Sequence, residues 1–151
     1  MRSTAYFKDL RALGVTPLLG DLDDRTSIAR IAGLADTVLH CAPPQNKGMR
    51  DTRTRHLLSA LSARTLPKQF IYISTSGVYG DCRGAHVSET HPLKPLTARA
   101  QRRVDAEKQI RSWAGHNHVS VGVLRVPGIY AAGRLPLERL QQGTPCITDS
   151  E

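Results

Sequence analysis

The sequence predicts an α/β fold with a doubly wound parallel sheet, and three observations indicate this class. Short runs of branched apolar residues recur along the chain, and stretches with apolar residues at helical spacing separate them. The run from Phe70 to Ile73 ends in three hydroxyl residues and then in glycines. Because open α/β sheets bind ligands outside the carboxyl ends of their strands, this run predicts a buried strand that presents a site.

The strand predictions rest on clusters of valine, isoleucine, leucine and aromatic residues. In chain order, the predicted strands cover residues 15–19, 37–40, 69–74 and 119–126. Prolines and glycines predict a loop over residues 80–96 and another break at residues 143–145. We find no linker that would separate two folded units, so the chain is predicted to be one domain or part of one.

Three segments between the strands carry apolar stripes that predict helices packed against the sheet. They cover residues 26–35, 50–63 and 97–114. The first stripe consists of Ile28, Ile31 and Leu34, the second of Leu57, Leu58 and Leu61, and the third of Ala106, Ile110, Trp113 and Ala114. Residues 135–142 predict a further helix after the last strand.

Composition and charge limit the kinds of partner and the cellular location that we expect for this chain. The formal net charge is +8, which alone would favour a basic interaction module with an anionic partner. The arginines are dispersed and no helix-turn-helix or RNA-binding motif occurs, so we expect no nucleic-acid partner. We find no apolar stretch long enough for a membrane span and no signal peptide, and therefore expect a cytoplasmic protein without membrane contact. The three cysteines and the pair His116 and His118 lack metal-ligand spacing, so no metal site is predicted.

Five ordered motifs carry a family resemblance. The strand end at residues 72–80 reads Tyr-Ile-Ser-Thr-Ser-Gly-Val-Tyr-Gly, and residues 20–24 read Gly-Asp-Leu-Asp-Asp. The others lie at residues 36–43, 89–95 and 124–130. Together they resemble the extended short-chain dehydrogenases/reductases, the NAD-dependent epimerase/dehydratase group, over residues from about 10 to about 145. The resemblance implies a Rossmann-like domain that uses NAD or NADP.

The resemblance also implies that part of the family pattern is missing. Nothing in the sequence matches the first strand, the Gly-x-x-Gly-x-x-Gly phosphate turn or the second strand, and residues 8–14 look like the end of the helix before the third strand. The expected fold is therefore a partial Rossmann-like doubly wound parallel sheet without these elements, and without the substrate domain. We expect a piece of a longer protein. The alternative is that Met1 is the true start, in which case we expect marginal folding of the chain alone. The incomplete sheet would favour self-association.

By resemblance, the cofactor-binding residues come from three strand ends. Asp21 would accept a hydrogen bond from the adenine amino group, with the backbone of Leu22 nearby, although Asp21 could instead be a turn or capping residue. Ala42 and Pro43 would line the cofactor through their backbone. Pro127 and Gly128 would lie near the nicotinamide ring.

The catalytic residues implied by the family are only partly present. Thr75 matches the serine or threonine that polarises the substrate oxygen. The tyrosine and lysine of the family's acid–base pair are replaced by Arg99 and Arg103, and an arginine stays protonated near neutral pH. Arg103 could still bind ribose or phosphate, or both arginines could lie on a solvated helix face.

The expected function is that of an NAD(P)-dependent epimerase, dehydratase or reductase acting on a sugar nucleotide or small carbonyl compound, inactive in this form. The alternative is a non-catalytic dinucleotide-binding or regulatory protein.

Overall fold

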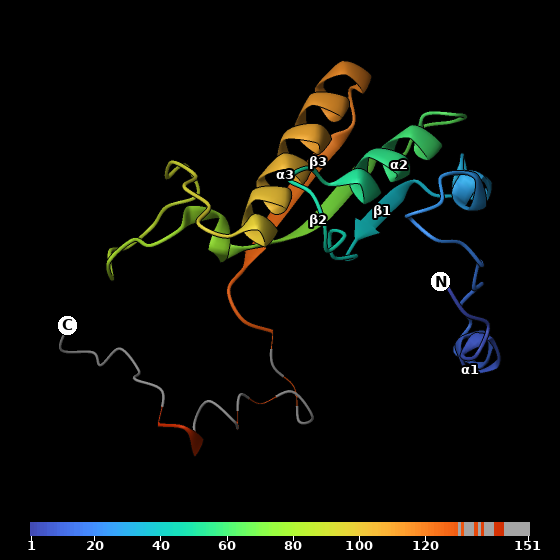
Figure 1. Ribbon diagram of the computed structural model, residues 1–151. Coiled ribbons are helices and arrows are strands. Elements are labelled where there is room, and N and C mark those ends of the chain that lie inside the picture. The colour runs from blue at the N-terminus through green and yellow to red at the C-terminus, as the bar shows by residue number, and fades with distance from the viewer. Residues whose placement is uncertain (130, 132–134, 136, 138–140, 144–151) are drawn as a thin grey trace.

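The computed structural model describes residues 1–129, 131, 135, 137 and 141–143. Its centre is a parallel sheet in the order β1-β2-β3, formed by β1 (Thr37–His40), β2 (Gln69–Thr75) and β3 (Ser120–Val126) (Figure 1). Phe70 of β2 pairs with Val38 on one side and with Val121 on the other. The predicted α/β class, the partial Rossmann-like sheet and three of the four predicted strands are thus confirmed.

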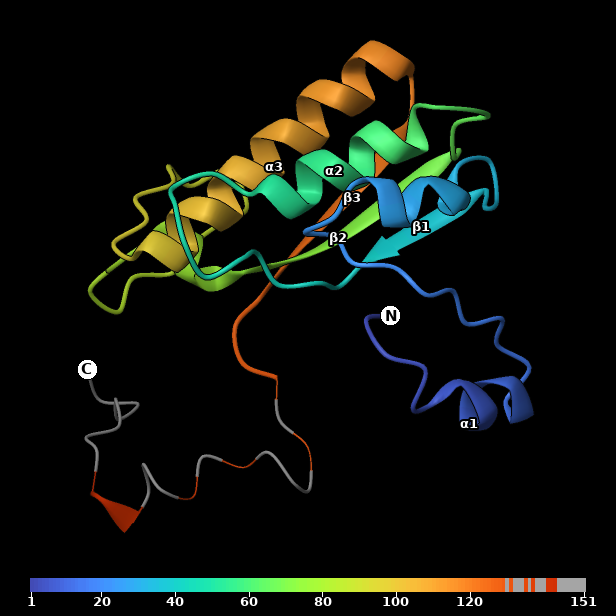
Figure 2. The same ribbon diagram turned by 45° about the vertical axis from the view of Figure 1, so that its right-hand side comes forward.

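Two helices, α2 (Thr52–Leu61) and α3 (Ala98–Asn117), lie side by side on one face of the sheet (Figures 1 and 2). Each begins at a side chain that accepts a hydrogen bond from the first turn, Asp51 for α2 and Thr97 for α3. Alternate residues of β2 point toward the helices, and Phe70 and Tyr72 are fully buried there. Both predicted helices are confirmed. The core between helices and sheet comprises Leu57, Leu58, Leu61, Phe70, Tyr72, Ala106, Ile110, Ala114 and Val119.

The predicted strand over residues 15–19 is wrong. This segment belongs to no strand. Its neighbour is the chain start, where Met1 N donates to the Leu18 carbonyl and Gly20 N to the Met1 carbonyl, both at 2.9 Å. A strand needs a neighbour that continues the hydrogen-bonded ladder. Among the described residues, the backbone hydrogen bonds of this segment involve only Met1 and Leu10, neither of which lies in a strand, so the apolar pattern alone forms no strand here.

The N-terminal helices are shorter than the sequence predicts. Residues 26–35 form a 3₁₀ helix, η1 (Thr26–Ile31), and Gly33 follows with a φ of +73°, a left-handed conformation that stops further helical turns. The helix α1 (Phe7–Ala12) confirms the helical reading of residues 8–14, buries no residue and lies away from the sheet (Figure 2). A second 3₁₀ helix, η2 (Ser76–Tyr79), precedes the confirmed loop over residues 80–96.

The second face of the sheet is bare of helices among the described residues. Leu39 and Leu124 project from it and are 60% and 52% exposed, with the half-buried Ile71 and Ile73 between them. The predicted self-association stays a prediction. The predicted helix over residues 135–142 lies largely outside the described residues, as do Tyr130 and Cys146. None of the helices in the described part of the chain is long and apolar enough to cross a lipid bilayer.

Candidate functional site

The site predicted after the strand ends is built from two segments that are distant in sequence. One is the acidic turn, residues 20–24, and the other is the proline loop, residues 41–44, which follows β1. Leu22, Ala42 and Pro43 line a single cavity of about 390 Å³, together with Met1, Arg2, Gly20 and Arg53. Three of the predicted cofactor residues are therefore brought together, with Asp21 next to Leu22 in the chain. We call this space the turn cavity.

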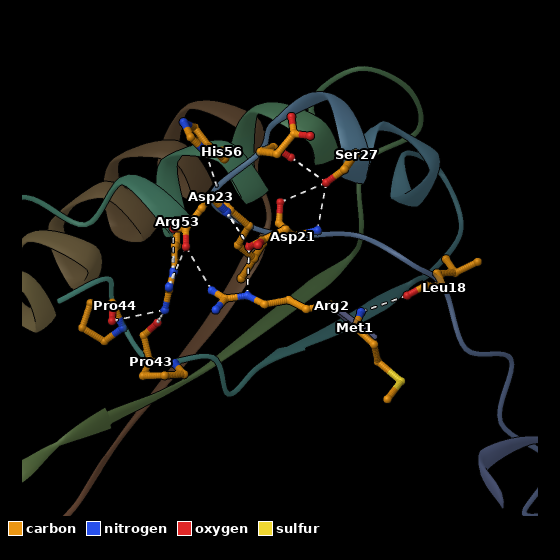
Figure 3. Close-up of polar contacts among 12 residues, drawn as sticks. Met1, Arg2, Leu18, Asp21, Asp23, Ser27, Pro43, Pro44, Arg53 and His56 are labelled. Atoms are coloured by element: carbon orange, nitrogen blue, oxygen red, sulfur yellow. Dashed lines mark hydrogen bonds and ion pairs between the residues drawn. The ribbon is translucent and has the colours of Figure 1, made fainter. Parts of the chain in front are cut away.

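The acidic turn is held in place by backbone N–H groups that donate hydrogen bonds to side chains. Asp21 N donates to Ser27 Oγ at 2.8 Å, and Asp23 N donates to Asp21 Oδ1 at 3.0 Å (Figure 3). A side chain at Gly20 would lie 3.0 Å from Ile28 and 3.1 Å from the Ser27 carbonyl oxygen. Glycine therefore allows the turn to approach η1 closely.

The structure bears on the alternative that Asp21 is a capping residue. Asp24, rather than Asp21, accepts hydrogen bonds from the backbone and hydroxyl of Thr26 at 3.0 and 2.7 Å, and these bonds lower the pKa of Asp24. Asp21 Oδ1 accepts from Asp23 N and from Arg2. No described residue donates to Asp21 Oδ2, so this oxygen can accept a hydrogen bond from a ligand.

Two arginines that the sequence reasoning missed complete the turn cavity. Arg53, in the first turn of α2, donates to both carboxylate oxygens of Asp23 at 2.7 Å and to the Pro43 carbonyl at 3.1 Å (Figure 3). Arg2 donates to Asp21 and Asp23 at 3.0 Å each. The Arg53 hydrogen bonds are the main cause of the lowered pKa of Asp23, and they raise the pKa of Arg53. No sequence signal indicates these pairs, because the partners lie far apart along the chain.

The carbonyl of Leu22 is also held in place. His56 Nδ1 lies 2.8 Å from the Leu22 carbonyl oxygen, one helical turn after Arg53 on α2. The helix α2 therefore fixes the acidic turn through two side chains and the proline loop through one. The loops that line the turn cavity are therefore attached to a rigid helix.

Thr75 lies at the end of β2, where the sequence places it. Its Oγ1 accepts a hydrogen bond from Gly77 N at 3.3 Å and caps η2. The side chain is half-buried. Because Oγ1 acts as acceptor in this cap, the hydroxyl hydrogen remains available to a ligand oxygen.

The two arginines at the family's acid–base positions have different surroundings. Arg99 is exposed in the first turn of α3. Arg103 is buried, and its Nη1 donates to Tyr72 Oη and to the Ile73 carbonyl, both at 2.9 Å. The described hydrogen bonds of Arg103 thus run to β2, and its cofactor role stays a prediction.

Arg103 also affects its buried neighbours. The ring of His40 stacks on Tyr72, with ring centroids 5.2 Å apart, and lies among the same core residues. Burial, and to a lesser degree the charge of Arg103, lowers the pKa of His40 to about 4. Burial raises the pKa of Tyr72 to about 12.

Pro127 and Gly128 follow β3 and do not line the turn cavity. Pro127 instead lines a separate cavity with Tyr79 and Arg125. Gly128 is exposed, and nothing lies within 4 Å of the position that a Cβ would take there. Their predicted place near a nicotinamide ring is untested.

Comparison with known proteins identifies a family. Residues 2–144 match the family model described as the NAD dependent epimerase/dehydratase family. A comparison with curated proteins finds no match.

Solved structures share the fold. UDP-glucuronic acid 4-epimerase from Bacillus cereus, in complex with NAD, is 23% identical with a TM-score of 0.70, over 95% of this chain and 52% of that one. RMD from Pseudomonas aeruginosa, complexed with NADPH, is 23% identical with a TM-score of 0.69, over 91% and 58%. A short-chain dehydrogenase/reductase superfamily protein from Agrobacterium tumefaciens with bound NAD is 24% identical with a TM-score of 0.63, over 80% and 44%. The chain therefore spans about half the length of these proteins.

Proposed function

The chain belongs to the NAD-dependent epimerase/dehydratase family, and on that premise we propose that the turn cavity binds the adenosine end of NAD(H) or NADP(H). The observation that carries the proposal is the meeting of the acidic turn and the proline loop around one cavity of about 390 Å³. Asp21 Oδ2 would accept from the adenine amino group. Leu22, Ala42 and Pro43 would contact the apolar faces of the nucleoside.

The residues present fit this group chemically. A nucleoside offers an amino donor and ribose hydroxyls. The turn cavity offers backbone carbonyls and two guanidinium groups, and Asp21, between the lining residues Gly20 and Leu22, offers a carboxylate oxygen. The sequence has no glycine-rich turn to bind the pyrophosphate. We therefore expect affinity to come mainly from the adenosine end.

For the reaction, we propose a sugar nucleotide or a small carbonyl compound as the substrate, with Thr75 donating to the substrate oxygen. A bound dinucleotide supplies hydride chemistry in this family. Position 99 carries an exposed arginine instead of a phenol, and arginine cannot exchange a proton near neutral pH. We therefore expect binding with little or no turnover in this form. This substitution also favours the second candidate, a non-catalytic dinucleotide-binding or regulatory protein in the cytoplasm.

Isothermal titration of the purified chain with NAD⁺, NADP⁺ and adenosine tests the proposal. We expect saturable binding that Asp21→Asn weakens by about tenfold, as expected for the loss of a hydrogen bond to a charged acceptor. Asp36→Asn is the matched control, since Asp36 is 78% exposed and pairs with Lys68. The proposal fails if neither dinucleotide nor adenosine binds, or if Asp21→Asn and Asp36→Asn behave alike.

A further inference from the structure

A second cavity, of about 600 Å³, lies at the carboxyl end of β3, away from the turn cavity. Its walls come from η2, from the loop after η2, from α3 and from β3. The lining residues that offer polar groups are Ser76, Tyr79, Cys82, Glu89, Arg111 and Arg125. We call this space the edge cavity, because β3 is an edge strand of the described sheet.

Arg125 is the centre of the polar contacts beside the edge cavity. Its Nη2 donates to Glu107 Oε2 at 2.8 Å, and its Nη1 donates to Tyr79 Oη at 2.8 Å and to the Glu89 carbonyl at 2.9 Å. Glu107 is 2% exposed and also accepts from Ser74 Oγ at 2.6 Å. Strand β3 is thereby joined to α3, to η2 and to the loop.

This arrangement has a cost that suggests a role beyond stability. Taking a carboxylate and a guanidinium out of water costs about as much free energy as their attraction returns, so a buried ion pair is weak support for stability. Glu107 compensates the charge of Arg125 and, with its hydrogen bonds, raises the pKa of Arg125 further. Arg125 therefore keeps its charge and a fixed orientation beside the cavity.

The wall opposite β3 is rigid as well. Lys94 N donates to the Val78 carbonyl at 3.1 Å, which returns the loop to η2. Gly80 has a φ of +78°, and a Cβ there would overlap the Lys94 carbonyl oxygen. The position of Tyr79, between Val78 and Gly80, is therefore set by the backbone on both sides.

The hydroxyl of Tyr79 is directed by these contacts. Because Tyr79 Oη accepts from Arg125, its own hydrogen points away from Nη1, and no described residue accepts it. The phenol ring also lies against Arg125, with the guanidinium carbon 4.9 Å from the ring centroid. A half-buried phenol with an unused donor thus lines a cavity large enough for a small molecule.

The charges around the edge cavity limit the class of ligand. Glu107 offsets Arg125, and Arg111 and Glu89 contribute one opposite charge each, so the lining is neutral as a whole. Ser76 and Tyr79 supply hydroxyl donors and Arg111 a guanidinium, so the lining offers several hydrogen-bond donors to a ligand. A neutral compound that is rich in oxygen acceptors fits this lining best.

We propose that the edge cavity binds a small neutral carbonyl compound, and that Tyr79, oriented by Arg125, donates the hydrogen bond to its carbonyl oxygen. The proposal rests on the proposed function only for the carbonyl class. In this proposal Tyr79 supplies a phenol at this edge of the sheet, whereas position 99 carries an arginine.

The test uses [2-¹³C]dihydroxyacetone as a neutral ketone probe with the whole chain. A hydrogen bond to the carbonyl shifts its ¹³C resonance downfield, so we expect a saturable downfield shift. Tyr79→Phe keeps the ring and its edge contact with His91, and should remove the shift and weaken binding about five- to tenfold. Tyr6→Phe is the matched control, because Tyr6 is exposed beside α1, and should leave both unchanged.

A second measurement is independent of any variant. Nuclear Overhauser contacts between the probe and the ring protons of Tyr79 are expected in the unmodified chain. Absence of these contacts, absence of a shift, or a shift that persists in Tyr79→Phe would each overturn the proposal. Dinucleotide binding takes place at the turn cavity and is measured separately, so failure there does not mimic failure here.

Discussion

Arg53 donates two parallel hydrogen bonds of 2.7 Å to the carboxylate of Asp23, which lies on a different segment of the chain. The same guanidinium donates to the carbonyl of Pro43. One side chain of α2 therefore joins both loops that line the turn cavity. Two parallel N–H donors to one carboxylate fix direction as well as distance, which a lysine in this position would not do.

We predict that Arg53→Ala loosens the turn cavity more than it destabilises the fold. The pair is partly exposed, so the loss of unfolding free energy should be at most about 1 kcal/mol. Dinucleotide affinity should fall by a larger factor, because the acidic turn loses its contact with the proline loop. Isothermal titration and urea unfolding measure the two effects. Arg55→Ala, an exposed arginine on the same helix, should change neither, and an equal effect of both variants would contradict the prediction.

We predict that acid destabilises the chain through His40. The pKa of His40 is about 4 in the fold and about 6.5 when unfolded. Between these values the unfolded chain binds more protons, so stability falls as the pH drops from 6.5 toward 4. At about 1.4 kcal/mol per pKa unit, the loss at pH 5 is on the order of 2 kcal/mol.

Urea unfolding at pH 7 and pH 5 measures this loss. His40→Gln should lower stability at pH 7 but reduce its dependence on pH. His116→Gln, at an exposed position, should retain the dependence of the unmodified chain. A His40→Gln variant with undiminished pH dependence would show that another group is responsible.

The buried and exposed ion pairs should respond differently to loss of one charge. The side chains of Glu107 and Arg125 are 2% and 13% exposed, respectively. Glu107→Gln leaves the guanidinium of Arg125 without its charged partner and should lower the free energy of unfolding by about 3–5 kcal/mol. Asp36→Asn breaks an exposed pair with Lys68 and should cost less than about 1 kcal/mol. Thermal unfolding of both variants makes the comparison, and similar melting temperatures would refute it.

We predict that the chain self-associates through the bare face of the sheet. Leu39 and Leu124 lie on that face and are more than half exposed, and exposed apolar patches of this kind favour association. Size-exclusion chromatography with light scattering should show oligomers that the double change Leu39→Glu and Leu124→Glu converts to monomers. Leu13→Glu, which alters an exposed residue just after α1, serves as the control. Monomers at every concentration of the unmodified chain would disprove the prediction.

Much of the fold could be predicted because its signals are local. The apolar run before Ser74 predicts β2 with an error of one residue, and the capping residues Asp51 and Thr97 begin their helices where the apolar stripes indicate. The segment at residues 15–19 shows the limit of such reasoning. Its composition suits a strand, but a strand also needs a partner, and pairing is not a property of the segment itself.

The site was predicted only in part for a similar reason. Ala42 and Pro43 follow β1, and Asp21 and Leu22 follow the segment that the sequence predicts as a strand at residues 15–19, so both pairs are expected at the carboxyl edge of the sheet. Arg2 and Arg53 reach the same place through long side chains from elsewhere, and one sequence carries no sign of such pairs. Arg103 shows a further limit, because its sequence position suggests a ligand contact but does not reveal the hydrogen bonds that it donates to β2.

The order of the strands also has a consequence for how the chain is made. β2 is the central strand of the described sheet, and its second partner, β3, is the last strand among the described residues. During synthesis, both edges of β2 can therefore pair only after Val126 has left the ribosome. Between the synthesis of β2 and that of β3 the nascent chain carries an open, aggregation-prone strand edge, so the yield of folded protein in the cell should depend on chaperones that bind it during this interval.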